Sequence, residues 1–200
     1  MIEAVVFDLG KVLVDFDFSI AARKLAARGT MPAESVRVII QESPALVRLE
    51  SGLSTNQAFY EEVRTLTGFQ GSFDEFATTF ANIFTPMDEM IALHARVRER
   101  GLPTYILSNT NDLATSHIRR AFPFFSTFDG YIFSYEVKSM KPDPRIYEAL
   151  ERLAGKTGAA ILYLDDRIEN LKPGSARGWQ VIHQRSSQET ITAFQALGLD

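Results

Sequence analysis

The stretch Ala4-Val5-Val6-Phe7-Asp8 decides the fold, because it is a continuous apolar run that stops abruptly at a carboxylate. Such a run is typical of a strand that is buried on both faces of a sheet. Residues 102–107 and 159–164 repeat the pattern, and they stop at Ser108 and at Asp165-Asp166 respectively. The sequence therefore predicts three buried strands, each followed by a polar side chain.

Helices with recognisable start signals accompany these strands. Each signal is a capping residue with proline at the next position or with glutamate three residues on: Thr85-Pro86, Asp143-Pro144, and Ser186 with Glu189. The matching stop signals are glycines: Gly101, Gly155 and Gly198. The alternation of buried strands and helices predicts an α/β fold, with a Rossmann-like parallel sheet and helices on both faces.

Residues 16–84 differ from the rest of the chain because they contain no buried strand run. Four helical stretches are expected there: residues 21–28, residues 33–40, a segment capped by Ser54 with Gln57, and a segment capped by Ser72 with Glu75. We therefore predict an all-α helical-bundle cap at 16–84, inserted into an α/β core formed by residues 1–15 and 85–200. Because the insertion follows the first strand, the cap should lie over the carboxyl end of that strand.

The composition of the 200 residues argues against several function classes. Twenty-one Lys and Arg against 25 Asp and Glu give a net charge of -4, so no overall basic charge favours nucleic acid as a partner. The absence of cysteine excludes disulfides, thiolate metal sites and thiol nucleophiles. No apolar run approaches the ~20 residues of a membrane-spanning helix, so we expect a cytoplasmic protein without a membrane partner. Nothing in the sequence indicates the oligomeric state.

The polar residues at the three predicted strand ends form a candidate site. In open α/β sheets the ligand crevice lies at the carboxyl ends of the parallel strands, which brings Asp8, Ser108 and Asp165-Asp166 together. Hard oxygen ligands without histidine or cysteine suit Mg²⁺, which usually shares its coordination shell with substrate phosphate. The sequence therefore predicts a magnesium site and phosphoryl-transfer chemistry.

Four stretches of the chain resemble the ordered motifs of the haloacid dehalogenase superfamily. They are Phe7-Asp8-Leu9-Gly10-Lys11-Val12-Leu13-Val14-Asp15, Leu107-Ser108-Asn109-Thr110-Asn111, Lys141-Pro142-Asp143-Pro144, and Leu164-Asp165-Asp166-Arg167-Ile168-Glu169-Asn170. Their order, with a helical insertion between the first and second, is similar to phosphatases with a helical-bundle cap, including the sugar phosphatases that act on glucose 1-phosphate. The resemblance implies a Mg²⁺-dependent phosphomonoester hydrolase acting on a small phosphorylated metabolite, such as a sugar phosphate.

The resemblance also implies a role for each matching residue. Asp8 would attack phosphorus and form an aspartyl-phosphate. The implied metal ligands are Asp8, the carbonyl oxygen of Gly10, and Asp166. Asp165 would be either a further ligand or an acid that contacts the ligands without binding the metal ion. Ser108 and Asn109 would bind phosphate oxygens, Lys141 would offset negative charge, and Asn170 would support the metal site from outside the ligand set.

One position departs from the family pattern. Many family phosphatases carry a second aspartate two residues after the nucleophile, where it protonates the leaving oxygen, and here that residue is Gly10. Losing a positioned general acid typically costs about 10²- to 10⁴-fold in rate, so substrates with good leaving groups are expected. Asp15 or an acid of the cap could replace it. Arg48 and Glu50 either reach the substrate or belong to an exposed charged face.

Two other functions compete with the phosphatase interpretation. A 2-haloacid dehalogenase would use the same aspartate to displace halide, and it would need no acid at Gly10. Asp165-Asp166 would then crowd an anionic substrate without a metal ion, which favours the phosphatase. A phosphate-binding or partner-binding module without turnover is the third possibility, and the joint presence of Asp8, Ser108 and Lys141 argues against it.

Overall fold

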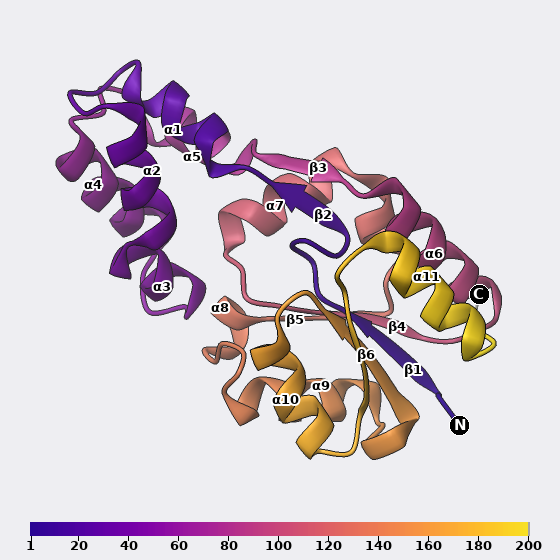
Figure 1. The fold of residues 1–200 in the computed structure, drawn as a ribbon. Helices are drawn as coiled ribbons and strands as arrows, with labels where there is room; N and C mark the ends of the chain where they lie inside the picture. Colours follow the sequence, from indigo (N-terminus) through magenta and orange to yellow (C-terminus); the bar gives the residue numbers. More distant parts are fainter. Residues whose placement is uncertain (200) are drawn as a thin grey trace.

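A five-stranded parallel sheet forms the centre of the computed structural model, which describes residues 1–199 (Figure 1). Its strands are β1 (Ala4–Phe7), β4 (Thr104–Ser108), β5 (Gly130–Phe133), β6 (Ile161–Asp165) and β7 (Gln180–His183), in the order β5-β4-β1-β6-β7. Every neighbouring pair is parallel. The three strands predicted from apolar runs are confirmed, and they are the three central strands.

Helices cover both faces of this sheet. They are α6 (Asp88–Glu99), α7 (Asp112–Ala121), α8 (Ser134–Val137), α9 (Pro144–Ala154), α10 (Ile168–Ala176) and α11 (Ser187–Ala196), with 3₁₀ turns at Pro123–Thr127 and Gly158–Ala160. Side chains alternate between the faces of a strand: Val5 and Phe7 pack in one core cluster with α6 and α11, whereas Ala4 and Val6 pack in another with α9. Figure 1 shows α6 and α11 on one side of the sheet and α9 and α10 on the other. The predicted α/β fold is confirmed.

The helix predicted to start at Thr85-Pro86 begins later. These two residues belong to β3 (Phe84–Pro86), which pairs antiparallel with β2 (Val14–Phe16), and α6 begins at Asp88. The backbone pairing with β2 holds Thr85 and Pro86 in an extended conformation, so it overrides the local capping signal. The predictions at Asp143 and Ser186 are confirmed, because both side chains cap their helices.

The insertion between β2 and β3 consists of five helices: α1 (Phe18–Ala26), α2 (Ala33–Glu42), α3 (Pro44–Glu50), α4 (Asn56–Thr67) and α5 (Phe73–Ala81). The sequence predicted four of them and did not predict α3. Ser72 and Glu75 form the expected capping box of α5. The expected cap of α4 is wrong by one residue: Thr55, not Ser54, accepts a hydrogen bond from the Ala58 N–H.

These five helices enclose an apolar core of their own, to which Leu113 of α7 adds. Figure 1 shows them gathered apart from the sheet and joined to it by β2 and β3. The division at residues 15/16 and 84/85 into core and cap stays a prediction. Within residues 1–199, no helix combines the length and the apolar character that crossing a membrane requires.

Candidate active site

Asp8 follows the last residue of β1 and is 7% exposed. Its backbone N–H donates to the Leu164 carbonyl at 2.9 Å, which continues the ladder with β6, and its Oδ1 accepts from the Leu9 N–H at 2.7 Å. Burial raises the pKa of Asp8 to about 7, although the ammonium of Lys141 acts in the opposite direction. A carboxylate in such a place needs a cation nearby to stay ionised.

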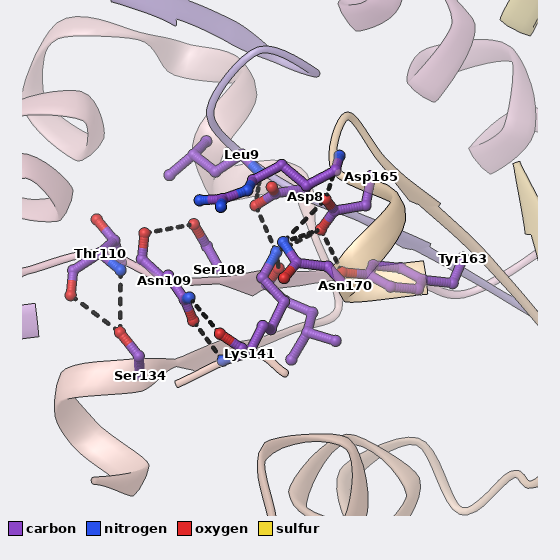
Figure 2. A network of polar contacts seen from close by, with 12 residues as sticks. Asp8, Leu9, Ser108, Asn109, Thr110, Ser134, Lys141, Tyr163, Asp165 and Asn170 are labelled. Atoms are coloured by element: carbon purple, nitrogen blue, oxygen red, sulfur yellow. Dashed lines mark hydrogen bonds and ion pairs between the residues drawn. The ribbon is translucent and has the colours of Figure 1, made fainter. Parts of the chain in front are cut away.

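Lys141 is the buried cation beside Asp8 (Figure 2). Its Nζ lies 3.0 Å from Asp8 Oδ1 and 2.6 Å from Asp165 Oδ2, and it donates to the Leu107 carbonyl at 2.9 Å. Burial alone would lower the pKa of Lys141, but the charges of Asp8 and Asp165 outweigh burial and raise it. The ammonium therefore stays charged between two carboxylates.

Asp165, the last residue of β6, is fully buried and surrounded by hydrogen-bond donors. The donors are Lys141 Nζ, the Tyr163 hydroxyl, the Asn170 side-chain amide at 3.0 Å and the Arg167 backbone N–H at 2.8 Å. A carboxylate offers about four lone-pair positions, so these donors occupy its acceptor capacity. Burial alone would raise the pKa of Asp165. The charge of Lys141 and the hydrogen bonds from the donors outweigh burial, so the pKa is lowered.

Asp166 completes a cluster of three acids at the ends of β1 and β6. One ligand oxygen from each of Asp8, Asp165 and Asp166 lies within 4.8 Å of the others. Burial, followed by the charge of Asp165, raises the pKa of Asp166. Two acids with raised pKa values beside a single lysine are an arrangement that a divalent cation would stabilise, and an all-oxygen donor set fits Mg²⁺.

Ser108 and Asn109 bring the end of β4 to the same place. The Asn109 side chain accepts from the Lys141 N–H at 2.7 Å and donates to the Lys141 carbonyl at 2.9 Å. This reciprocal pair fixes the loop that carries the lysine against the loop that follows β4 (Figure 2). Two segments 32 residues apart in the chain are thereby locked into one site.

Two cavities lie at the loop that follows β1, and Asp8 lines one of them. The first is called the polar cavity here; its lining includes Asp8, Gly10, Glu50, Ser108, Asn109, Lys141, Asp166 and Asn170. The second is called the apolar chamber; its lining includes Leu9, Phe16, Phe18, Phe80, Ile83, Phe84 and Ala114, with Glu50 and Asn111 among its polar residues. They share Gly10, Phe16, Phe18, Glu50, Ser108 and Asn109, so they meet at a common boundary.

The structure brings most of the candidate residues together and leaves a few apart. All the residues assigned to catalysis, phosphate or metal line the polar cavity except Asp165, which lies behind Lys141. Asp15 and Arg48 do not line either cavity: Asp15 pairs with Lys11, and Arg48 pairs with Glu62 at 2.6 Å on the surface. Glu50 does line both cavities.

Tyr163 is a contact of the site that sequence reasoning missed. Its hydroxyl donates to Asp165, two residues further along β6. Side chains two residues apart point to the same face of a strand, so the alternation pattern could have indicated this pair. Asn111 was also missed as a site residue; its side chain caps α7, and it lowers the pKa of Glu50.

Comparison with known proteins places the chain among hydrolases. A family model described as haloacid dehalogenase-like hydrolase matches residues 2–178. The chain is 23% identical over 197 residues to the D-ribitol-5-phosphate phosphatase of Bacteroides thetaiotaomicron, covering 94% of this chain and 95% of that protein. It is 25% identical over 200 residues to the sesquiterpene phosphatase astK of Aspergillus oryzae, covering 98% and 96%. The solved structure of a HAD-family enzyme from B. thetaiotaomicron, in complex with magnesium and inorganic phosphate, matches with a TM-score of 0.78 at 25% identity, covering 91% and 93%.

Proposed function

This chain belongs to the haloacid dehalogenase-like hydrolase family, and from that premise we propose that it is a Mg²⁺-dependent phosphomonoester hydrolase with Asp8 as its nucleophile. One observation carries the proposal. A buried carboxylate at a strand end is held 3.0 Å from a buried lysine, beside two further acids and at the wall of a cavity. Attack at phosphorus needs this combination of an oxygen nucleophile and concentrated positive charge.

Asp8, the Gly10 carbonyl oxygen and Asp166 are the proposed ligands of Mg²⁺. All three residues line the polar cavity. Asp165 is in the same acid cluster, but its oxygens are already hydrogen bonded to four donors, so we assign it to holding Lys141 in place rather than to the ion. A bound Mg²⁺ would neutralise phosphate oxygens and favour close approach of the phosphate to Asp8.

The proposed reaction has two displacements at phosphorus. In the first, an Asp8 oxygen bonds to phosphorus while the bond from phosphorus to the leaving oxygen breaks, giving an aspartyl-phosphate and an alkoxide, which takes up a proton to become the free alcohol. In the second, water attacks phosphorus and the bond to Asp8 breaks, giving inorganic phosphate and the original carboxylate. Lys141 offsets the negative charge shared by phosphate and nucleophile in both steps, and Ser108 and Asn109 bind phosphate oxygens.

The proposed substrate is a small phosphorylated metabolite, such as a sugar phosphate. Its phosphate would lie in the polar cavity, and its organic group would extend into the apolar chamber, whose lining combines the rings of Phe16 and Phe18 with polar groups such as Asn111. Two similar proteins carry the names D-ribitol-5-phosphate phosphatase and sesquiterpene phosphatase, which supports phosphate esters as the substrate class. A preference for glucose 1-phosphate and the exclusion of nucleic acid as a partner stay predictions.

The two competing functions fit the site less well. A 2-haloacid carries its own carboxylate, and Asp8, Asp165 and Asp166 would repel it because Lys141 is already shared between two of them. A module that only binds phosphate would not need a carboxylate nucleophile at the cavity wall. The buried ion pair of Asp8 with Lys141 therefore favours turnover of a phosphate ester.

A substrate panel tests the proposed function. Sugar phosphates, a sugar alcohol phosphate, a terpenyl phosphate, p-nitrophenyl phosphate and L-2-chloropropionate are offered with Mg²⁺ or with EDTA. We expect release of inorganic phosphate that requires Mg²⁺ and no release of chloride. Phosphate release that persists in EDTA, or release of chloride alone, would overturn the proposal.

A further inference from the structure

Position 10 offers no side chain, and an acid placed there would require the Phe16 ring to move. A Cβ atom built on Gly10 would lie 2.9 Å from Cε1 of the Phe16 ring, closer than such carbon atoms approach. Phe16 also packs edge-on against Phe18 and Phe84, so its ring is held by neighbours. A group that gives a proton to the leaving oxygen must therefore come from another part of the cavity lining.

The charged groups of the polar cavity, Glu50 apart, already have partners or proposed roles. They are Asp8, Lys11, Lys141, Asp166 and Arg167. Asp8 and Lys141 form the buried ion pair, and Asp166 is assigned to the metal ion. Lys11 pairs with Asp15, and Arg167 pairs with Glu169. Proton transfer to the substrate has one remaining acid in this lining, which is Glu50.

Glu50 lies where the organic group and the phosphate of a substrate would meet. It is the last residue of α3, it is partly buried, and it lines both the polar cavity and the apolar chamber. Among residues 1–199 no Lys or Arg forms an ion pair with it, and the Asn111 side chain is the polar group that acts on its pKa. Burial raises the pKa of Glu50 to about 7, and the Asn111 side chain acts in the opposite direction. A phosphate dianion nearby would favour the protonated form further.

The two residues after Glu50 fix this end of α3 against the α/β core. The Ser51 hydroxyl lies 3.0 Å from the Met140 sulfur, next to Lys141 in the chain. Gly52 has a φ of 66°, and a Cβ atom there would lie 2.1 Å from the Tyr135 carbonyl oxygen. Only glycine allows so close a backbone approach, so the contact sets the position of Glu50 over the site.

We propose that Glu50 is the general acid and base of the reaction, in place of an acid at position 10. As the bond from phosphorus to the leaving oxygen breaks, the Glu50 carboxyl gives that oxygen its proton and becomes a carboxylate. The carboxylate then takes a proton from the water that attacks the aspartyl-phosphate, which restores the carboxyl. The inference rests on the proposed function and adds a catalytic residue to it.

The test compares E50Q with the wild-type chain on phenyl phosphate and p-nitrophenyl phosphate. These substrates have rings of similar size, but the nitrophenolate leaves without a proton much more readily. For phenyl phosphate we expect E50Q to lower kcat by about 10²-fold or more. For p-nitrophenyl phosphate we expect a rapid burst of one nitrophenolate per active site and then slow turnover, because only the second step needs the base. A purely structural role for Glu50 would produce no burst.

Two further variants control this comparison. E62Q removes an exposed cap glutamate that lines neither cavity, and it should behave as wild type on both substrates. E50D keeps a carboxyl and should retain more phenyl phosphate turnover than E50Q, which also covers the case that E50Q folds poorly. Equal losses on both substrates without a burst, or no loss at all, would overturn the role of Glu50. If the wild-type chain with Mg²⁺ releases phosphate neither from any phosphate ester of the panel nor from phenyl phosphate, the proposed function itself fails.

Discussion

The ends of the central strands and the end of helix α3 contribute to the same cavity in different ways. Asp8, Ser108 and Asp165 are placed by the backbone ladders of β1, β4 and β6, which fix them in one register. Glu50 is placed by a contact between two separately packed regions, through Gly52 and the Tyr135 carbonyl. The sheet thus holds the nucleophile and the charges rigidly, whereas proton transfer depends on how the inserted helices dock.

The largest effect is expected at the strand end. Asp8→Asn keeps the shape of the side chain but removes the nucleophilic carboxylate, so kcat for p-nitrophenyl phosphate should fall by at least about 10⁴-fold. Steady-state assays with saturating Mg²⁺ measure this, and circular dichroism confirms that the variant folds. A variant that keeps more than a hundredth of the wild-type activity would show that the chemistry does not start at the end of β1.

A pair of neighbouring variants tests the assignment of Asp165 and Asp166, the two acids at the end of β6. Asp166→Asn removes a proposed ligand, so the Mg²⁺ concentration for half-maximal activity should rise by about 100-fold or more. Asp165→Asn disturbs the position of Lys141 instead, so kcat should fall by about 10- to 100-fold. Its Mg²⁺ requirement should stay close to that of wild type.

Magnesium titrations of activity separate the two outcomes. Equal weakening of Mg²⁺ dependence in both variants would make Asp165 a ligand too, as the family resemblance allows. Either result assigns a role to an acid that the sheet positions, because both acids lie at the carboxyl end of β6.

The sequence predicts the strand-end half of the site better than the cap half, and the reasons are physical. Apolar runs that stop at Asp8, Ser108 and Asp165 identify buried strands, and parallel strands must bring their ends together. The position of Lys141 was obtained from a family motif, because no local pattern indicates that it would reach back to Asp8.

The cap half depends on interactions that a local pattern does not contain. Helix α3 has seven residues and no side-chain cap hydrogen bond, so it gives little helical signal. Whether Glu50 faces the cavity or the solvent is decided by the docking at Gly52, which is a tertiary contact. The late start of α6 has the same origin, since pairing of β2 with β3 overrides the signal at Thr85.

A change at Gly52 tests the docking without altering Glu50. In Gly52→Ala the methyl group would meet the Tyr135 carbonyl, and the left-handed backbone would be strained. The end of α3 should move away from the core, and kcat for phenyl phosphate should fall by about tenfold or more. The loss with p-nitrophenyl phosphate should be smaller in the first turnover. Gly101→Ala, also left-handed but with open space around it, is the matched control and should leave both rates unchanged.

The smallest expected effect on activity lies deep in the sheet domain, at His94 of α6. Its Nε2 is 3.0 Å from the Thr104 hydroxyl, and its ring stacks on Phe128 with centroids 3.8 Å apart. Burial, helped by the charge of Arg98, lowers the pKa of His94 to about 4 from 6.5. Between pH 6.5 and pH 4 the His94 imidazole is therefore protonated in the unfolded chain but neutral in the folded chain. The stability that the neutral, buried His94 contributes is complete above pH 6.5 and is lost as the pH falls toward 4.

Urea unfolding measures this contribution, because one proton changes the free energy of unfolding by about 1.4 kcal/mol per pH unit. Between pH 6.5 and pH 5, His94 should account for about 1.5 kcal/mol of lost stability. The variant His94→Gln should be less stable than wild type at neutral pH, because it loses the ring stacking. Between pH 6.5 and pH 5, however, its free energy of unfolding should fall less than that of wild type, by the amount assigned to His94. Its phosphatase activity at neutral pH should be unchanged. Residues 16–84 contain no histidine, so acid should weaken the sheet domain through a group that the cap does not have. An identical pH dependence of stability in wild type and variant would show that His94 is not the group through which acid weakens the sheet domain.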